Sequence, residues 1–242
     1  MLKLNKINGK KIAKRILIWS RNALIAFFVF SILLTFLYKF VPVYYTPLMF
    51  IRMHEHKNTK VEHRWVPIKK ISNTMVQAVI ASEDNLFMSH HGFDLKQIKE
   101  ARKEAEKGKR VRGASTISQQ TAKNVFLWPG KSYFRKGLEA YFTLLIEWIW
   151  GKERIMEVYL NSIEMGKDIY GVEAAAKNYY GKHAYQLTSG ESALIAAILP
   201  NPRKRNPSKP SAYLQGRQRD ILSLMRKIER ADIGYRRPIK AE

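Results

Sequence analysis

Three segments of the chain combine residue types that can carry acid–base or phosphate chemistry, and the first starts at Glu83-Asp84 and runs to His90-His91-Gly92. A carboxylate pair at a helix end, followed by an aromatic residue and a histidine, suits a cleft that holds one carboxylate partly desolvated and therefore more basic. The simpler interpretation is a helix C-terminus with a solvated acidic pair. Adjacent histidines point apart and cysteine is absent, so no structural zinc site is predicted.

The second segment, residues 113–124, joins small hydroxyl residues to two amides and a lysine. Four of its side chains recur on one side at helical spacing, namely Gln119, Gln120, Lys123 and Asn124. Amides can hold sugar hydroxyls, and a lysine can hold a phosphate. A polar helix N-terminus is the alternative interpretation, and this segment alone does not decide between the two.

The third segment contains Lys131, Arg135, Lys136 and Glu139. Arg135 and Glu139 stand four residues apart, which is the spacing of an ordinary intrahelical ion pair. Glu139 also lies beside an aromatic stripe, where a buried carboxylate needs a partner. A carboxylate within a cluster of Lys and Arg is the composition expected of a site that handles a diphosphate.

Helices are the elements that must position these groups. Apolar residues follow helical stripes over 75–80, 138–149, 155–160 and 192–199, and an amphipathic stretch covers about 211–230. Thr188 and Glu191 form a capping-box pattern, and a helix over 172–180 should end at Gly181. Convincing alternating strands are missing, so we predict an all-α domain over 61–230 with a basic tail at 231–242.

The N-terminal region predicts a membrane anchor. Residues 1–22 contain seven basic residues and no acidic one, namely Lys3, Lys6, Lys10, Lys11, Lys14, Arg15 and Arg21. An uncharged run over 23–38 follows, and a transmembrane helix at 23–40 is long enough if Arg21 snorkels. A cleaved signal peptide is the alternative, but residues 38–43 offer no small-x-small cleavage site.

The positive-inside rule then places a basic arm, residues 1–22, in the cytoplasm and everything after about residue 40 outside it. Residues 41–60, with several Pro and Tyr, read as an interfacial connector. The 242 residues include 43 Lys plus Arg, 20 Asp plus Glu and no cysteine, and 46% are hydrophobic. This composition excludes a disordered chain and thiol chemistry, and the excess charge predicts a polyanionic partner. With the body outside the cytoplasm, we expect an anionic membrane and no nucleic acid.

Four motifs together resemble the successive motifs of the peptidoglycan glycosyltransferases, and within that family its monofunctional transglycosylases. They are Glu-Asp-x-x-Phe-x-x-His-x-Gly at 83–92, Gly-x-Ser-Thr-x-x-Gln-Gln-x-x-Lys-Asn at 113–124, Arg-Lys-x-x-Glu at 135–139 and Lys-x-x-Ile-x-Glu-x-Tyr-Leu-Asn at 152–161. The resemblance covers most of residues 65–225. The Ser-x-x-Lys and Lys-Thr-Gly motifs of transpeptidases occur nowhere in the sequence, so penicillin-type acylation is not expected.

The resemblance implies a lysozyme-like helical fold and polymerisation of lipid II into β-1,4-linked glycan strands by inverting transfer, with release of undecaprenyl diphosphate. Glu83 would be the general base. Glu139 would orient cations, hold a divalent metal or assist departure of the diphosphate. The residues expected to bind substrate are Ser115, Gln119, Gln120, Lys123, Asn124, Lys131 and Arg135. Mg²⁺ or another divalent cation at the diphosphate is chemically reasonable, although the sequence contains no all-protein metal cage.

The expected location is the bacterial inner membrane, with a single span and a periplasmic catalytic domain. Expected partners are lipid II, the lipid-linked glycan strand, the membrane, and cell-wall synthesis or division proteins. Two departures from the family pattern concern Lys131, where many relatives have Arg, and the last motif, which Arg217 to Leu222 match only in part; Met156 also replaces a common Leu. A lysozyme-like hydrolase and a non-catalytic membrane-tethered module are the alternatives.

Overall fold

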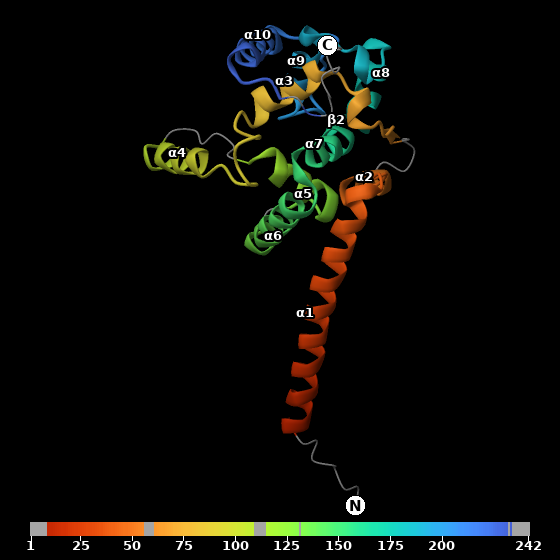
Figure 1. Ribbon diagram of the computed structural model, residues 1–242, viewed down its shortest axis with the longest axis vertical. Coiled ribbons are helices and arrows are strands. Elements are labelled where there is room, and N and C mark those ends of the chain that lie inside the picture. Colours follow the sequence, from red (N-terminus) through yellow and green to blue (C-terminus); the bar gives the residue numbers. More distant parts are fainter. Residues whose placement is uncertain (1–8, 56–60, 109–114, 131, 232, 234–242) are drawn as a thin grey trace, which may run out of the picture. The chain divides into compact units, whose positions relative to one another are not determined.

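The computed structural model describes residues 9–55, 61–108, 115–130, 132–231 and 233 (Figure 1). The chain divides into two compact units, Met1–Val41 and Pro42–Glu242. The predicted positions Lys131, Gly113 and Ala114 lie outside the described residues, as do Lys109 to Arg112 and most of the predicted tail.

The first unit consists of one helix, α1 (Gly9–Phe40). Its segment Lys11–Phe40 is long and apolar enough to cross a membrane, with a mean hydropathy of 2.2 in its most apolar window. The helix begins well before the predicted start at residue 23, because Lys and Arg are good helix formers and no Pro or Gly interrupts the segment after Gly9. It ends two residues before Pro42, which disfavours helical backbone at the residue before it.

The second unit is mainly helical, which confirms the predicted fold class. Its α-helices are α2 (Pro47–Glu55), α3 (Asn73–Glu83), α4 (Leu95–Glu106), α5 (Ile117–Phe126), α6 (Tyr133–Ile149), α7 (Gly151–Ser162), α8 (Val172–Tyr180), α9 (Ser189–Ile198) and α10 (Ala212–Lys227). Two short 3₁₀ helices are η1 (Ile68–Lys70) and η2 (Ala184–Gln186). Helix α2 lies within the segment predicted as an interfacial connector.

A small sheet, which the sequence does not predict, accompanies the helices. Its strands are β1 (Glu62–His63), β2 (Glu164–Gly166) and β3 (Ile169–Tyr170), in the order β1-β3-β2. Strand β1 runs parallel to β3, and β2 runs antiparallel to it. Strands of two or three residues are too short to produce a recognisable alternation of apolar and polar residues.

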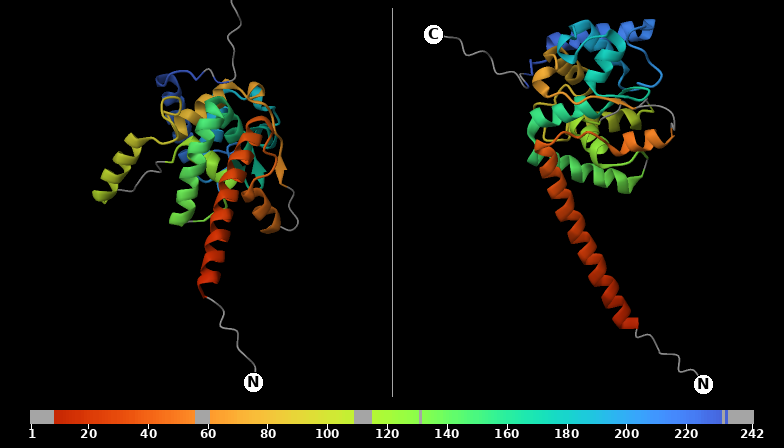
Figure 2. Two further views of the ribbon diagram at one scale, coloured as in Figure 1. Left: turned by 60° about the horizontal axis from the view of Figure 1, so that its bottom comes forward. Right: turned by 90° about the vertical axis from the view of Figure 1, so that its right-hand side faces the viewer.

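The helices of this unit pack in two groups of three. Helices α3, α9 and α10 pack together, and so do α5, α6 and α7 (Figures 1 and 2). Met75 of α3, Met156 of α7 and Ile195 of α9 are fully buried. Because Met and Leu have similar volumes, Met156 fills this part of the core much as the Leu expected from the family pattern would.

Helix ends follow the predicted signals. Thr188 and Glu191 form the predicted capping box at the start of α9, and Gly181 ends α8 with a left-handed φ of 67°. The segment predicted as a basic tail begins with buried residues, because Ala231 and Ile233 are each 4% exposed. Gln77 of α3 holds this segment by donating to the Glu229 carbonyl and accepting from the Ala231 N–H.

Candidate active site

Glu83 is the last residue of α3, and its side chain is anchored by two other helices. Gln120 Nε2 on α5 donates to Glu83 Oε2 at 2.9 Å. The hydroxyl of Tyr159 on α7 donates to Gln120 Oε1 at 3.3 Å. This chain of hydrogen bonds uses the Gln120 amide to connect a fully buried tyrosine to the carboxylate. Three helices therefore fix the position of Glu83.

Burial raises the pKa of the Glu83 carboxyl above its ordinary value. The hydrogen bond from Gln120 and the positive charges of Arg217 and Lys123 oppose this effect, and the negative charge of Asp84 adds to it. The alternative of a solvated acidic pair is wrong, because Asp84 is 2% exposed and Glu83 is half-buried. The carboxylate of Glu83 is thus a stronger base than an exposed one.

Asp84 has a different set of contacts and acts as a structural tie. Its carboxylate accepts from His90 Nε2 at 2.9 and 3.0 Å and from the Ile117 N–H at 3.0 Å. His90 Nδ1 accepts from the Gly92 N–H at 3.1 Å, so Nε2 carries the proton given to Asp84. Asp84 therefore joins the end of α3 to the start of α5. His91 is exposed, and the two histidines do not converge.

A second charged cluster lies on α6. Arg135 Nη1 donates to Glu139 Oε2 at 3.1 Å, and Lys136 Nζ pairs with Glu139 Oε1. The predicted intrahelical ion pair is confirmed, yet both Arg135 (9% exposed) and Glu139 (3%) are buried. Arg135 Nε is also buried and has no hydrogen-bond partner among the described residues. One buried cationic donor in this cluster remains available to a ligand.

Lys123 of α5 links the two clusters electrostatically. Burial lowers the pKa of its ammonium group, and the negative charge of Glu139 opposes this effect more than that of Glu83 does. The positive charges of Arg135 and Lys136 lower the pKa further. The pKa of Lys123 therefore depends on both carboxylates. Lys123 lies about one turn along α5 from Gln120.

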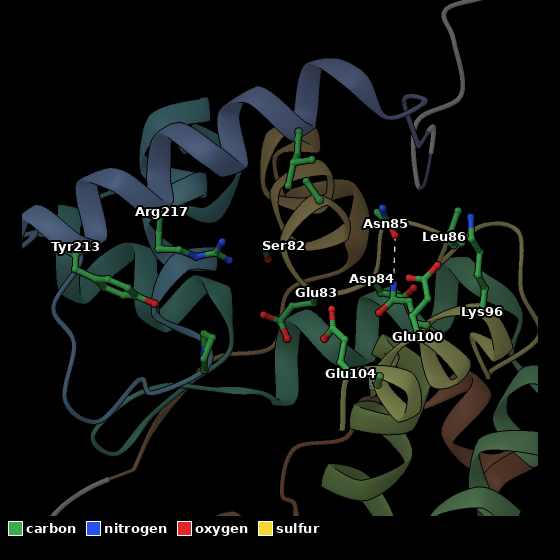
Figure 3. Close-up of a pocket in the computed structure, with 15 residues that line it drawn as sticks. Ser82, Glu83, Asp84, Asn85, Leu86, Lys96, Glu100, Glu104, Tyr213 and Arg217 are labelled. Carbon is green, nitrogen blue, oxygen red and sulfur yellow. Dashed lines mark hydrogen bonds between the residues drawn. The ribbon is translucent and has the colours of Figure 1, made fainter. Parts of the chain in front are cut away.

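Glu83 also lines a cleft of about 630 Å³, shown in Figure 3. Helix α4 contributes Glu100 and Glu104, and α10 contributes Tyr213 and Arg217. Figure 3 shows the Arg217 guanidinium extending from α10 toward the side of the cleft that holds Glu83. Lys123, Arg135 and Glu139 are not among the residues that line this cleft. Glu83 thus lines the cleft and also interacts electrostatically with Lys123.

The remaining predicted binding residues do not form one face. Gln119 is turned inward, where its Oε1 accepts from the Thr116 N–H at 3.0 Å in a capping box at the start of α5. Ser115 is exposed just before the same helix, and Asn124 is half-buried at its end. The predicted amide face is therefore divided, with Gln120 directed to Glu83 and Gln119 to its own helix N-terminus.

Residues of the fourth motif, 152–161, make structural contacts near the site. Asn161 of α7 accepts from the Val66 N–H and donates to the Val66 carbonyl, each at 2.9 Å. Lys152 Nζ pairs with Glu147 at 2.6 Å and stands 4.5 Å from the centre of the Phe87 ring. Tyr159 and Arg217 fall within the quoted motifs, but their roles at Glu83 were not predicted, because these roles depend on the packing of α7 and α10.

A half-buried carboxylate whose pKa is raised, in a cleft of a lysozyme-like helical domain, suits an enzyme that transfers sugars. A family model described as Transglycosylase matches residues 51–226. The chain therefore belongs to the transglycosylase family and is a peptidoglycan glycosyltransferase, which polymerises glycan strands.

Named relatives agree with this assignment. The chain is 59% identical to a biosynthetic peptidoglycan transglycosylase of Bacteroides thetaiotaomicron over 216 residues, which cover 88% of this chain and 87% of the relative. It is 52% identical to one of Caulobacter vibrioides over 205 residues, covering 83% and 89%. It is 50% identical to one of Bdellovibrio bacteriovorus over 209 residues, covering 85% and 84%.

Proposed function

We propose that the enzyme joins lipid II, as the acceptor, to a growing glycan strand held through undecaprenyl diphosphate, as the donor. The 4-hydroxyl oxygen of the acceptor sugar attacks the anomeric carbon of the donor. The bond from that carbon to the diphosphate oxygen breaks, and the diphosphate leaves with the electron pair. Attack from the opposite face inverts the anomeric centre and forms a β-1,4 link.

Glu83 receives the proton that the acceptor hydroxyl loses. The single observation that carries this assignment is the position of its carboxylate, which lines the cleft while Gln120 and Tyr159 hold it from behind. Its raised pKa supports the role, because a base works best when its pKa lies near the working pH. Positioned base catalysis contributes about 10²- to 10⁴-fold to a rate.

Cations on the other side of Glu83 stabilise the leaving diphosphate. Lys123 and Arg135 are partly or fully buried, and preorganised charges have their largest effect in such surroundings. The buried and unpartnered Nε of Arg135 supports an anionic ligand. Lys131, outside the described residues, remains a further candidate of the same charge. The described side chains that reach sugar or phosphate oxygens would include those of Ser115, Gln120 and Asn124.

The described residues do not fit a protein-held Mg²⁺. Both oxygens of Glu139 are already paired, one with Arg135 and the other with Lys136. Among the described ranges, no group of three or more His, Asp or Glu could hold a metal ion. Of the three roles expected for Glu139, holding and orienting the two cations is therefore the one that its contacts support.

The enzyme is anchored by α1, and we propose the inner membrane as its location, with a cytoplasmic N-terminus and a periplasmic catalytic domain. The basic residues before the apolar run support this orientation. Helix α6 also exposes large apolar residues, which suit an enzyme whose substrates carry lipid chains; they are Tyr133 (98% exposed), Phe134 (71%) and Trp148 (81%). Cell-wall synthesis or division proteins remain the proposed protein partners.

Polymerisation of labelled lipid II by the full chain in detergent tests this proposal. We expect wild type to form glycan polymer and Glu83→Gln to lose about 10²- to 10⁴-fold in rate while remaining folded. Glu153→Gln is the matched control, because it makes the same chemical change at an exposed position of α7 and should retain full activity. Near-wild-type turnover by Glu83→Gln would exclude the general-base role. Shortening of preformed glycan, without polymer formation, would indicate a hydrolase.

A further inference from the structure

One face of α10 presents an aromatic ring and a guanidinium to the cleft. Tyr213 and Arg217 stand four residues apart on this helix and both line the cleft. Tyr213 is 58% exposed. Figure 3 shows both side chains reaching from α10 toward the cleft that also holds Glu83. The positive charge of Arg217 acts on the pKa of Glu83, but neither residue of the pair belongs to the charged cluster on α6.

The ring of Tyr213 is held in position although it is exposed. The guanidinium carbon of Arg205 lies 4.9 Å from the ring centre, and Arg205 Nη2 donates to the Tyr213 hydroxyl at 3.4 Å. Arg205 Nη1 in turn donates to the Ala197 carbonyl of α9 at 3.0 Å. A cation on an aromatic face restrains the ring. Less conformational entropy is therefore lost when a ligand covers the ring's exposed surface.

An exposed, restrained ring beside hydrogen-bond donors suits a sugar. A pyranose ring has apolar C–H faces that can lie on an aromatic face, and its edge carries hydroxyl or acetamido oxygens. Tyrosine supplies a large apolar surface with a polar edge, and the guanidinium of Arg217 supplies donors in a fixed plane. Glu100 and Glu104, which α4 contributes to the same cleft, can accept from sugar hydroxyls.

We propose that Tyr213 and Arg217 form a saccharide subsite of the cleft, in which Tyr213 stacks on a pyranose ring and Arg217 donates to that ring's oxygens. This inference rests on the proposed function, because it takes the ligand to be a sugar of the acceptor or of the growing strand. The cleft is lined by the carboxylates of Glu83, Glu100 and Glu104 and by neither Lys123 nor Arg135, so an uncharged sugar unit suits it better than the diphosphate.

The first test measures binding without turnover. The probe is a soluble β-1,4-linked tetramer of N-acetylglucosamine, observed by saturation-transfer NMR with the full chain in detergent. We expect Tyr213→Ala to weaken binding by about 3- to 10-fold and Tyr213→Phe to retain most of it, because the ring remains. Tyr185→Ala is the matched control, since Tyr185 is also 58% exposed but does not line the cleft. Equal binding by wild type and Tyr213→Ala would overturn the proposal.

The second test assigns the sugar to its source through lipid II polymerisation. If Tyr213 holds the acceptor, Tyr213→Ala raises the KM for lipid II by about 3- to 10-fold at unchanged strand length. If it holds the growing strand, the variant makes shorter strands at an unchanged KM. Arg205→Gln, which releases the Tyr213 ring, should change whichever of KM or strand length Tyr213→Ala changes, but by a smaller factor. If neither KM nor strand length changes while wild type polymerises, the subsite is wrong and the proposed function stands; absence of polymer from wild type would instead overturn the proposed function.

Discussion

Glu83 and Asp84 are neighbours in the chain, yet their carboxylates have opposite surroundings. Glu83 faces a cleft and holds one hydrogen bond from Gln120. Asp84 is buried and accepts from a histidine and from a backbone N–H of the next helix. The helix ends between them, with Asp84 as its C-cap, so successive side chains leave in different directions. One carboxylate is thereby kept basic for the reaction, and the other maintains the geometry.

Glu83→Gln and Asp84→Ala should therefore have different effects on stability. When the pKa of a carboxyl group is higher in the folded than in the unfolded protein, the folded protein loses stability as the pH rises from the lower pKa through the higher one. Ionisation of Glu83 thus opposes folding, and Glu83→Gln should not lower the free energy of unfolding. Asp84→Ala removes three hydrogen-bond contacts to a buried charge and should lower it by about 2 to 4 kcal/mol. Denaturant unfolding of both variants measures this, and a less stable Glu83→Gln would contradict it.

The pH dependence of the reaction should depend on Arg217. The groups that act on Glu83 are Gln120, Arg217, Asp84 and Lys123, and the positive charge of Arg217 opposes the rise in its pKa. Removing that charge in Arg217→Met should raise the pKa further and move the acidic limb of kcat/KM to higher pH. The limb falls toward acid because a protonated base is inactive. If the acidic limb stays in place or moves to lower pH, the charge of Arg217 does not lower the pKa of Glu83.

At the scale of the elements, the β2–β3 hairpin is fitted against α7 at a single glycine. Gly171 has a φ of 78°, and a Cβ there would lie 2.6 Å from the Asn161 carbonyl oxygen. Asn161 also holds the backbone at Val66. The close approach of two backbones therefore joins the start of α8 to the helix that carries Tyr159.

Two glycines that both have a positive φ should respond differently to alanine. Gly171→Ala adds a clash with backbone to the strain of a positive φ, whereas Gly181→Ala, at φ 67°, meets nothing within 4 Å. We expect about 1 kcal/mol of destabilisation for Gly181→Ala and at least twice that for Gly171→Ala. Chemical denaturation of both variants gives the comparison. Equal losses would mean that the hairpin can move away from α7 at little cost.

Helices with a buried stripe could be predicted from the sequence, and those without one could not. The stripes of α3, α6, α7 and α9 place apolar residues in the core, so their periodicity is plain. Helix α4 buries none of its twelve residues, and the strands are too short for a pattern. Glu83 and the Arg135–Glu139 pair were found through motif and spacing. The capping role of Gln119 was missed, although Thr116 three residues earlier is a readable capping-box signal.

At the scale of the whole molecule, the orientation of the chain can be tested because it has no cysteine. Single cysteines at Lys11 and Glu153, both exposed, would be the only thiols present. In cells with a permeabilised outer membrane, we expect a membrane-impermeant maleimide to label Glu153→Cys. Lys11→Cys should react only after the inner membrane is broken, because the basic residues before the apolar run predict a cytoplasmic N-terminus. The reverse pattern would contradict the proposed topology.

The two walls of the cleft differ in how firmly they are held. Helices α3 and α10 are packed with α9, whereas α4, whose residues are all described, buries none of them. Gln97 of α4 donates a 3.4 Å hydrogen bond to the side chain of Asn85, just after α3. A segment with so little buried surface opens locally at small cost in free energy. The side of the cleft formed by α4 is therefore the one that opens most easily, and a long polymer held in the cleft would leave most easily from that side.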